Sequence, residues 1–443
     1  MRLTLIKPNI GRLEHSLYVD EGRMQPLQLG VLAGLCPEDV EVRLYDDRVE
    51  PIPLDEPTDL VAITVETFTA RRAYELADDY RSRGVKVILG GMHPTLLPEE
   101  AAVHADALYL GDAEERFHEV LRDARKGTLA PLYRALPGPP QTGSVPRRAL
   151  FHGKGYLPIA LAQFSRGCKY TCEFCAISTY FGATHFRRQV RELIAELEAV
   201  SEKLIFFVDD NIVADREAAK VLCRELKPLG KRWVSQASID MTEDLELMEL
   251  MVESGCLGHV VGFESLEPAS LRSMRKIPNL RQSKGRYAEQ LAVIRSFGLQ
   301  LWAAFTLGHD HDTVDTVRRT VEFAIEQKFC FAAFNLLVPY PRTPLYERLR
   351  REGRLLYEGC WWLHPEYRFN HAPFRPAKMS ADELTEACFE ARKRFNGLGS
   401  ILYRSLDPAT TLRSPYRFAL YWAYNPLFRR ETFRKQGMRL GLR

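Results

Sequence analysis

The sequence has 443 residues, of which 46% are hydrophobic and 27% are charged. This composition excludes a disordered chain, and the length indicates two or three domains because one domain usually takes about 100–200 residues. The 61 basic and 58 acidic residues almost cancel, so the charge does not indicate a protein that binds nucleic-acid phosphates.

Targeting segments and a disulfide framework are not expected either. The N-terminus lacks the apolar core and cleavage site of a signal peptide, and no run of about 18 apolar residues could span a membrane. We therefore expect a cytoplasmic protein. Its nine cysteines are an odd number, which argues against systematic disulfide pairing and makes closely spaced cysteines candidates for metal ligands.

Short apolar runs alternate with amphipathic helical patterns over the first 130 residues. The predicted strands are 3–8, 40–46, 59–65, 85–91 and 107–112. The helical patterns cover 25–35, 69–83, 96–104 and 113–126. Nearly continuous apolar strands separated by helices predict a parallel sheet covered on both faces, that is, a doubly wound (Rossmann-like) α/β domain.

Ligands of doubly wound folds bind at the carboxyl ends of the strands. The candidate contact residues at these ends are Pro8, Asn9, Thr64, Thr67, Gly90, Gly91, His93, Gly111 and Glu114. The glycines would allow a large planar ligand to approach the backbone, but they are equally explained as turn residues, and His93 as a helix-entry residue. Neither a GxGxxG motif after the first strand nor a GxxxxGK[ST] motif is present, which argues against a dinucleotide or P-loop site.

A segment rich in proline and glycine, LPGPPQTGSVPRR, interrupts this pattern from residue 136. Such a segment continues neither a helix nor a strand. We therefore expect a first domain over 1–135, a linker over 136–150, a second domain over 151–345 and a mainly helical C-terminal region over 346–443.

The most specific motif, RGCKYTCEFCAI, follows an apolar run at 158–165. Its residues Cys168, Cys172 and Cys175 have the spacing CxxxCxxC. Three thiolates at this spacing can hold a cubane 4Fe-4S cluster and leave its fourth iron without a protein ligand. A structural zinc ion would need a fourth Cys or His nearby, and the next histidine, His185, has no paired partner in the sequence.

This motif, with Phe174 before its last cysteine, resembles the signature of the radical S-adenosylmethionine superfamily. In that superfamily the open iron binds S-adenosylmethionine, and one electron cleaves it to methionine and a 5′-deoxyadenosyl radical. The resemblance places Phe174 on the adenine side. Together with 158–165, five later apolar runs match the superfamily's partial (β/α)6 barrel: 203–210, 232–238, 258–265, 301–308 and 331–339.

Catalytic groups in such barrels lie at the carboxyl ends of the strands. The candidates for holding S-adenosylmethionine are Asp209, Asp210, Asn211, Gln236, Ser238, Asp240, Glu264, Ser265 and Gly308. Family members bind the methionine amine at the end of the second strand, although the residues there would also serve as a helix N-cap. Glu264 lies in an apolar strand and would need a partner if buried, and a bound cofactor would be one.

The phrases ILGGMHPTLLPEEA and YLGDAEE resemble the N-terminal domain of cobalamin-dependent radical S-adenosylmethionine enzymes, a group that includes radical methylases and proteins of bacteriochlorophyll and hopanoid biosynthesis. The resemblance implies that the carboxyl-end residues of the first domain contact cobalamin. The DxHxxG motif of methionine synthase-like proteins is absent, since the loop after the first strand reads KPNIGRLEH. Cobalamin would therefore lack a histidine ligand, or the domain would have lost the cofactor.

The resemblance implies an enzyme that uses a 4Fe-4S cluster, S-adenosylmethionine and cobalamin to methylate an unactivated carbon of a small-molecule or natural-product substrate. A radical rearrangement, cyclisation or oxidation without methyl transfer is the alternative enzyme reaction, and a redox sensor is the alternative outside enzymes. An electron donor such as flavodoxin or ferredoxin is expected as a partner. No residue is assigned as a catalytic acid or base.

Two features of the C-terminal region leave alternatives open. Trp361, Trp362, His364 and Tyr367 predict either a plug over the barrel mouth or a plain core. Residues 404–443 combine arginines with aromatic residues, which fits a helical cap with a solvated basic face, a membrane-surface or partner helix pair, or a grip on a phosphorylated substrate. A helix over 379–397 is predicted from the capping-box pattern of Ser380 and Glu383.

Overall fold

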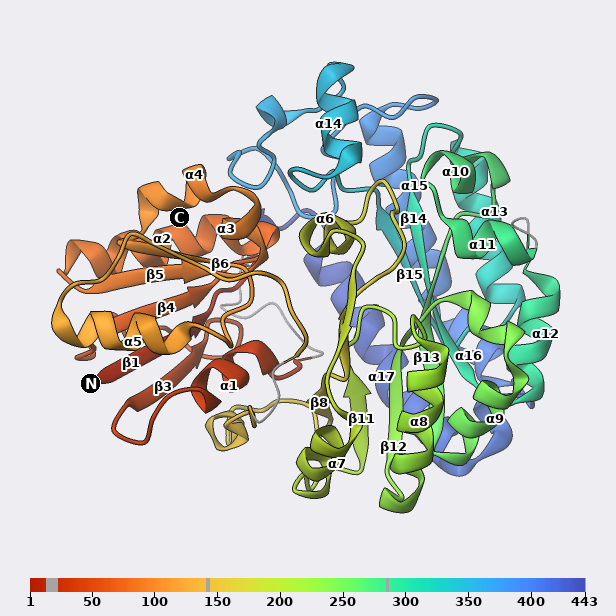
Figure 1. Cartoon of the computed structure of the whole chain (residues 1–443). Helices are drawn as coiled ribbons and strands as arrows, with labels where there is room; N and C mark the ends of the chain where they lie inside the picture. Colours follow the sequence, from red (N-terminus) through yellow and green to blue (C-terminus); the bar gives the residue numbers. More distant parts are fainter. Residues whose placement is uncertain (13–22, 141–143, 284–286, 443) are drawn as a thin grey trace. The chain divides into compact units, whose positions relative to one another are not determined.

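The computed structural model describes residues 1–12, 23–140, 144–283 and 287–442 (Figure 1). By its internal contacts the chain forms two compact units. Unit 1 comprises Met1–Leu157, Tyr357–Phe369 and Gly437–Arg443, and unit 2 comprises Pro158–Leu356 and Asn370–Gln436. The segment expected as a separate C-terminal region thus contributes to both units. Residues 13–15, in the loop without the DxHxxG motif, and 141–143, in the expected linker, lie outside the described residues.

Unit 1 is built on a six-stranded parallel sheet in the order β3-β1-β4-β5-β6-β7. Its strands are β1 (Arg2–Lys7), β3 (Glu41–Asp46), β4 (Leu60–Thr64), β5 (Lys86–Gly90), β6 (Ala107–Leu110) and β7 (Leu132–Arg134). Its helices are α1 (Leu27–Gly34), α2 (Ala70–Ser82), α3 (Met92–Leu96), α4 (Pro98–Ala101) and α5 (Phe117–Lys126), with short 3-10 turns at η1 (Thr67–Thr69), η2 (Ala102–His104), η3 (Arg148–Phe151) and η6 (Tyr357–Gly359). The doubly wound architecture is confirmed, and the chain reverses its direction across the sheet between β1 and β4.

Local chemistry explains where helices of unit 1 deviate from the predicted ranges. The pattern predicted over 96–104 is divided between α3 and α4 at Leu97, which has φ −130° and ψ 63°. The following Pro98 disfavours helical backbone at the residue before it. Helix α5 ends at Gly127, whose φ of 68° provides the left-handed C-cap.

Both ends of the described chain contribute to unit 1. Strand β16 (Arg439–Leu440) pairs antiparallel with β2 (Gly11–Arg12). The aromatic residues Trp361, Trp362 and Tyr367 are almost completely buried, and Trp361 packs 4.8 Å from Phe68 between ring centroids. They therefore form part of the core of unit 1.

Unit 2 contains a six-stranded parallel sheet in the order β15-β14-β13-β12-β11-β8. Its strands are β8 (Ala160–Ala162), β11 (Leu204–Phe207), β12 (Arg232–Ala237), β13 (Cys256–Glu264), β14 (Gln300–Leu307) and β15 (Phe331–Leu336). Strand order follows chain order, which confirms the predicted partial barrel of six strands. A separate antiparallel pair is formed by β9 (Ser165–Gly167) and β10 (His185–Arg187).

Helices surround the sheet of unit 2. They are α6 (Ala176–Phe181), α7 (Val190–Glu198), α8 (Arg216–Leu226), α9 (Leu245–Glu253), α10 (Pro268–Ser273), α11 (Ile277–Ser283), α12 (Ala288–Ser296), α13 (Val314–Glu326), α14 (Pro344–Arg351), α15 (Ala381–Phe395), α16 (Leu398–Ser405) and α17 (Pro415–Lys435), with 3-10 turns η4 (Lys227–Leu229), η5 (Ile239–Glu243) and η7 (Thr411–Arg413). The capping box of Ser380 and Glu383 at α15 is confirmed. Among the described helices, none combines the length and apolar character needed to cross a bilayer.

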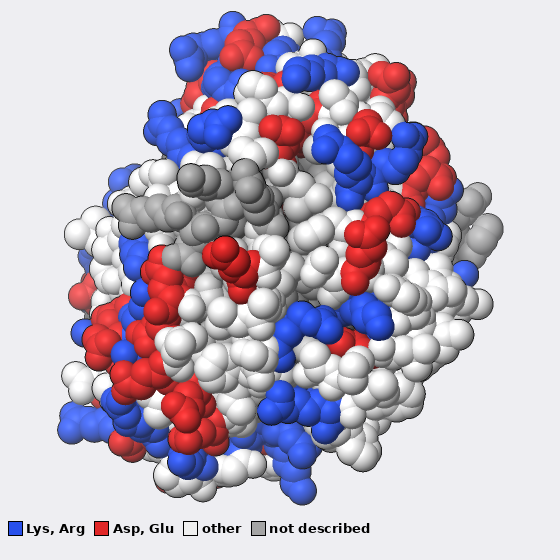
Figure 2. Space-filling model, turned by 90° about the vertical axis from the view of Figure 1, so that its right-hand side faces the viewer, with Lys and Arg blue, Asp and Glu red and all other residues white. Residues whose placement is uncertain are grey.

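The surface carries charges of both signs, as the nearly equal numbers of basic and acidic residues predict. On the face drawn in Figure 2, lysines and arginines lie interspersed with aspartates and glutamates, and uncharged areas separate them.

Candidate functional site

The three motif cysteines lie on one loop of unit 2, between β9 and α6. All three are free thiols, with Cys172 buried and Cys168 and Cys175 partly buried. The carbonyl of Cys172 accepts a hydrogen bond of 3.1 Å from the amide of Cys175, which is the N-cap residue of α6. Burial raises the pKa of the Cys172 thiol to about 11, and the neighbouring Lys276 opposes this shift.

These cysteines fit a cubane cluster better than a single ion. Among the described residues, no group of three or more His, Cys, Asp or Glu side chains is gathered closely enough to hold one metal ion. A cubane spreads its ligands over separate irons, so three thiols on one loop suffice without such a close gathering.

Asp209 and Asp210 anchor the backbone that leads into the cysteine loop. The fully buried carboxylate of Asp209 accepts a 3.0 Å hydrogen bond from the amide of Phe164 and two further bonds from the amide and hydroxyl of Ser165. Asp210 accepts a 2.7 Å bond from the amide of Gly167. These contacts break the predicted strand 158–165 into β8 and β9, and they occupy both carboxylates inside the protein. These bonds give both residues a structural role, and their predicted contact with S-adenosylmethionine stays a prediction.

A second polar network joins the ends of β11 and β12 to the same loop. Asn211 and Ser238 exchange hydrogen bonds of 3.0 Å, from the Asn211 amide to the Ser238 hydroxyl and from the Ser238 backbone to Asn211 Oδ1. Gln236 donates to the carbonyl of Asp209 at 3.1 Å. Tyr170, on the cysteine loop, donates to Asp240 at 2.8 Å. Four residues that were predicted to hold S-adenosylmethionine thus lie close together: Asn211, Gln236, Ser238 and Asp240. These hydrogen bonds join them to other protein groups.

A cavity of about 540 Å³ lies beside this network. It is lined by Lys169, Tyr170, Arg216, Asp240, Glu243, Ile277 and Pro278. The Arg216 guanidinium forms ion pairs with Asp240 at 3.3 Å and with Glu243, so the charges in the cavity wall are largely neutralised.

Glu264 does have the partner that its apolar strand required, but the partner is a lysine. The Glu264 carboxylate is 2.6 Å from Lys276 Nζ and accepts a 2.7 Å hydrogen bond from the hydroxyl of Thr306. Burial opposes the charge of Lys276, yet Glu264 and the thiols of Cys172 and Cys175 raise its pKa above the ordinary value. A buried cation next to the cysteine loop favours the thiolate forms that cluster binding requires. No sequence pattern marked Lys276.

His309, directly after β14, is a second residue that the sequence did not mark. Its side chain is buried, and Nε2 has no hydrogen-bond partner among the described residues. The imidazole stands edge-on to Phe174, with 5.9 Å between ring centroids. A buried nitrogen without a partner is costly, so a ligand at this end of the barrel would stabilise it.

Two other predicted contacts have structural explanations. Ser265 is fully buried, and its hydroxyl accepts a 3.0 Å bond from the amide of Glu267 in the turn before α10. Gly308 has φ 111°, and a Cβ there would lie 2.5 Å from a methyl of Leu384. The positions of Ser265 and Gly308 are therefore explained by turn geometry and packing without a cofactor.

In unit 1, the carboxyl ends of β1 and β4 form the point where the strand order reverses. Lys7 ends β1, and its ammonium lies 2.6 Å from Glu66, whose side chain is 57% exposed. Pro8 and Asn9 are buried; Asn9 donates to the carbonyl of Asp47 at 3.1 Å, and its Oδ1 has no partner among the described residues. Doubly wound folds bind ligands at this point of the sheet.

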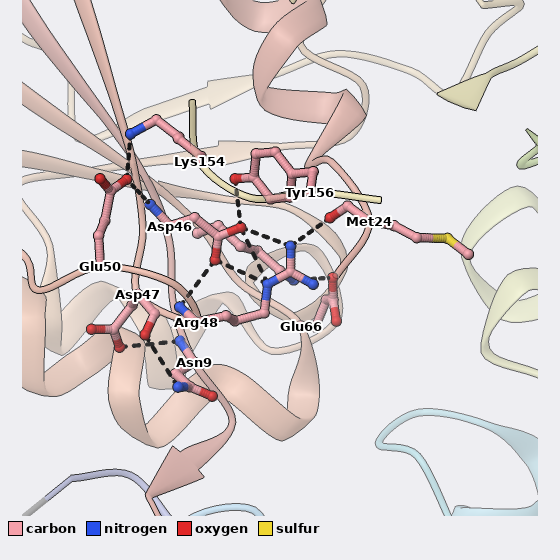
Figure 3. Close-up of polar contacts among 10 residues, drawn as sticks. Asn9, Met24, Asp46, Asp47, Arg48, Glu50, Glu66, Lys154 and Tyr156 are labelled. Atoms are coloured by element: carbon pink, nitrogen blue, oxygen red, sulfur yellow. Dashed lines mark hydrogen bonds and ion pairs between the residues drawn. The ribbon is translucent and has the colours of Figure 1, made fainter. Parts of the chain in front are cut away.

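At the same edge of the sheet, a network of charged and polar side chains holds the end of β3 in place (Figure 3). The buried carboxylate of Asp46 accepts hydrogen bonds from the guanidinium of Arg48, at 2.7 Å from Nη2, and from the hydroxyl of Tyr156 at 2.8 Å. Arg48 also donates to the carbonyl of Met24 at 2.7 Å. These bonds hold the end of β3 and connect it to Tyr156, in the segment that follows the expected linker.

The side chain of His93 is turned into the interior of unit 1. It has no exposed surface, Nδ1 lies 3.3 Å from the hydroxyl of Thr67, and Nε2 lies 2.9 Å from Glu100. Both ring nitrogens are thus used within the protein. The cobalamin contacts of His93 and Thr67 stay predictions, and both residues also have this structural role.

The glycines at the strand ends divide into two kinds. Gly91 and Gly111 have φ 106° and 88°, and a Cβ would lie 2.9 Å from the carbonyl of Val65 and 2.1 Å from that of Ala135, respectively. The need for a residue without a side chain in these tight turns is therefore enough to explain both glycines. At Gly90 a Cβ would make only ordinary contacts, 3.6 Å from Tyr109. All three glycines and the partly exposed Thr64 and Glu114 remain predicted cobalamin contacts.

Comparisons with known proteins agree with this division of the chain. The B12 binding domain model matches residues 18–121, and the Radical SAM superfamily model matches residues 162–324. The chain is 30% identical over 396 residues to the bacteriochlorophyllide d C-12(1)-methyltransferase of Chlorobaculum tepidum, covering 86% of this chain and 84% of that protein. It is 28% identical over 373 residues to the hopanoid C-2 methylase of Rhodopseudomonas palustris, covering 79% and 69%.

Among solved structures, the fold is similar to that of TsrM from Kitasatospora setae, a radical S-adenosylmethionine methyltransferase described with cobalamin and a [4Fe-4S] cluster bound. The TM-score is 0.64 at 17% identity, and the similarity covers 97% of each chain.

Proposed function

Because this chain belongs to the family of B12-binding radical S-adenosylmethionine methyltransferases, we propose that it methylates an unactivated carbon of a small, largely apolar molecule. The observation that carries the proposal is the free CxxxCxxC loop at the first barrel strand, in one chain with a B12-binding unit. The apolar character of the substrate is supported by relatives named for bacteriochlorophyllide d and hopanoids.

The bound cofactors supply one-electron cleavage of S-adenosylmethionine at the cluster and carriage of a methyl group by cobalamin. Cys168, Cys172 and Cys175 would hold the cluster, with Lys276 favouring their thiolate forms. Asp209 fixes the backbone that precedes this loop, and this would hold the three thiols in position for the cluster. His309 would orient the ligand by accepting or donating one hydrogen bond at its unpartnered nitrogen.

In unit 1, the residues at the strand-order reversal fit a corrin. The corrin ring carries peripheral amide groups, and the buried Oδ1 of Asn9 is an acceptor that has no partner among the described residues. An amide N–H placed there would satisfy it. We therefore assign Asn9 as a cobalamin contact, with Pro8, Thr64, Gly90 and Glu114 as neighbouring contacts. An electron donor of the flavodoxin or ferredoxin type would reduce the cluster in the cytoplasm.

The test compares apolar small molecules from a strain that lacks the gene with those from strains that carry the wild type or Cys175→Ala. We expect a species with one additional methyl group only with the wild type. Anaerobic turnover of its precursor should then yield S-adenosylhomocysteine and 5′-deoxyadenosine in about equal amounts, if each cofactor-borne step occurs once per turnover. If turnover instead yields 5′-deoxyadenosine and a rearranged, cyclised or oxidised product, without S-adenosylhomocysteine, the methylation proposal is wrong and the alternative reaction takes its place.

A further inference from the structure

Helices α16 and α17 lie together over the edge of the unit 2 sheet and bury one face each. Ile401 of α16 and Tyr421 of α17 pack with Cys330, next to the edge strand β15, and the Tyr421 hydroxyl donates to the carbonyl of Ile401 at 2.7 Å. Arg404 and Asn425 are buried in the same interface, 3.3 Å apart. The opposite faces of the two helices are thus turned to solvent.

These outer faces are apolar and aromatic, unlike those of ordinary surface helices. The exposed large residues are Leu398, Leu402, Tyr403, Leu406, Leu412, Phe418 and Trp422, with exposed fractions between 36% for Trp422 and 69% for Leu398. Leu398, Leu402 and Leu406 are spaced by four positions, as are Phe418 and Trp422, so each set forms a stripe. Phe418 and Trp422 are adjacent, with 6.3 Å between ring centroids. Exposed apolar and aromatic residues gathered on two packed helices in this way indicate an interaction site.

All exposed charges on this face are basic. Asp407 is the one acidic residue in the sequence from 397 to 430, and it is fully buried and bonded to Arg295 at 2.7 Å. Arg413 and Arg430 are exposed at the margins. Lys328 adds a further cation, placed 4.9 Å from the centroid of the Tyr403 ring. The face therefore combines an apolar and aromatic centre with a cationic margin.

From this combination we propose that the α16–α17 face, defined as the seven exposed residues above with Lys328, Arg413 and Arg430, binds the surface of an anionic membrane. Apolar side chains would enter the boundary of the acyl chains, tyrosine and tryptophan favour the interface, and the cations would meet lipid phosphates. Pairing with a second copy is disfavoured, because a two-fold interface would bring the same cationic margins together. The proposal stands apart from the proposed function, although it would bring the enzyme to an apolar substrate.

The test is sedimentation of the full-length, cluster-loaded protein with vesicles of phosphatidylcholine, alone or mixed with phosphatidylglycerol. We expect binding to the mixed vesicles that weakens with added salt, and little binding to the neutral ones. Two double variants, Leu402→Ser with Trp422→Ser and Arg413→Glu with Arg430→Glu, should each lower the partition coefficient about tenfold or more, because each removes part of the apolar or the electrostatic attraction.

The control is Leu245→Ser, which removes an equally exposed leucine at the start of α9, outside this face. It should bind like the wild type, and iron content should be unchanged in all variants. The proposal is overturned if the wild type ignores the anionic vesicles, or if Leu245→Ser loses as much binding as the double variants. It is also overturned if light scattering shows a dimer that the serine variants dissociate, which would make the face a self-association surface. Vesicle binding is measured without turnover, so its failure is distinguishable from failure of the methylation proposal.

Discussion

The indole nitrogen of Trp362 donates to both carboxylate oxygens of Glu100, at distances of 3.1 and 3.0 Å. Glu100 also accepts from the hydroxyl of Tyr74 and contacts the imidazole of His93, each at 2.9 Å. A residue from the last quarter of the sequence thereby completes a polar cluster beneath the β5–α3 turn of unit 1. The β5–α3 turn, which carries predicted cobalamin contacts, is therefore stabilised by a segment that is distant in sequence.

We expect Trp362→Phe to lower the stability of the protein by about 1–3 kcal/mol, since it keeps an aromatic ring but leaves the Glu100 carboxylate short of a donor. Cobalamin binding should weaken with it, while the iron content stays unchanged. Denaturant unfolding and an absorption titration with hydroxocobalamin measure the two effects. Glu115→Gln, at an exposed position of the same unit, is the control. If Trp362→Phe unfolds at the same denaturant concentration as the wild type, the hydrogen bonds between Trp362 and Glu100 do not stabilise the protein.

The pH dependence of the same cluster can be measured separately. Burial acts to raise the pKa of Glu100, but the hydrogen bond and charge of His93 outweigh it and lower the pKa. A carboxyl group with a depressed folded-state pKa stabilises the fold above its unfolded value of about 4.3, and this contribution is lost as the pH falls through the folded value. We therefore expect the stability difference between the wild type and Glu100→Gln to shrink below about pH 4.3 in unfolding experiments. If the stability difference between the two proteins does not change with pH, the pKa of Glu100 is not lowered in the folded protein.

Removing any one of the motif thiols should abolish the cluster. Anaerobically reconstituted wild type should contain about four irons and four sulfides per chain, and Cys168→Ala, Cys172→Ala and Cys175→Ala should each lose them. Cys223→Ala is the matched control, because Cys223 is a buried core residue of α8. Iron retained by a variant that lacks all three motif cysteines would refute the cluster assignment.

Asp209→Asn distinguishes the structural role from cofactor binding. An amide cannot accept all three bonds that the carboxylate receives from Phe164 and Ser165, so we expect a loss of about 1–3 kcal/mol in stability and a reduced iron content. The affinity of correctly folded protein for S-adenosylmethionine should change little. A stable, fully iron-loaded Asp209→Asn with strongly reduced affinity for S-adenosylmethionine, measured by calorimetry, would instead show that Asp209 holds the cofactor.

His309→Phe tests the unpartnered imidazole nitrogen. The ring contact with Phe174 can persist, but the hydrogen bond to a ligand cannot form, so we expect about five- to tenfold weaker binding of S-adenosylmethionine to the cluster-loaded protein. His309→Gln retains a polar group and should recover part of the affinity. Unchanged affinity in His309→Phe would remove this residue from the site.

Local patterns in the sequence were enough to determine the architecture and to predict the metal ligands. Alternating apolar runs and helices specify a doubly wound unit and a six-stranded barrel, because periodicity reflects which side chains are buried. The CxxxCxxC spacing predicts the cluster ligands, since three thiols on one loop need no distant partner. The capping box at Ser380 was equally readable, because both of its members belong to one helical turn.

The partners of polar groups were decided by tertiary structure alone. Asp209 follows β11 and Glu264 ends β13, two apolar strands of the same sheet, yet Asp209 anchors backbone amides and Glu264 pairs with Lys276. The burial of His93 depends on Glu100 and on Trp362, which is more than 250 positions further along the chain. Such contacts join residues that are distant in sequence, and a hydrogen-bonding group has the same chemistry whether it faces a ligand or the protein interior. Only packing, which excludes water and places the donor and acceptor together, distinguishes these two cases.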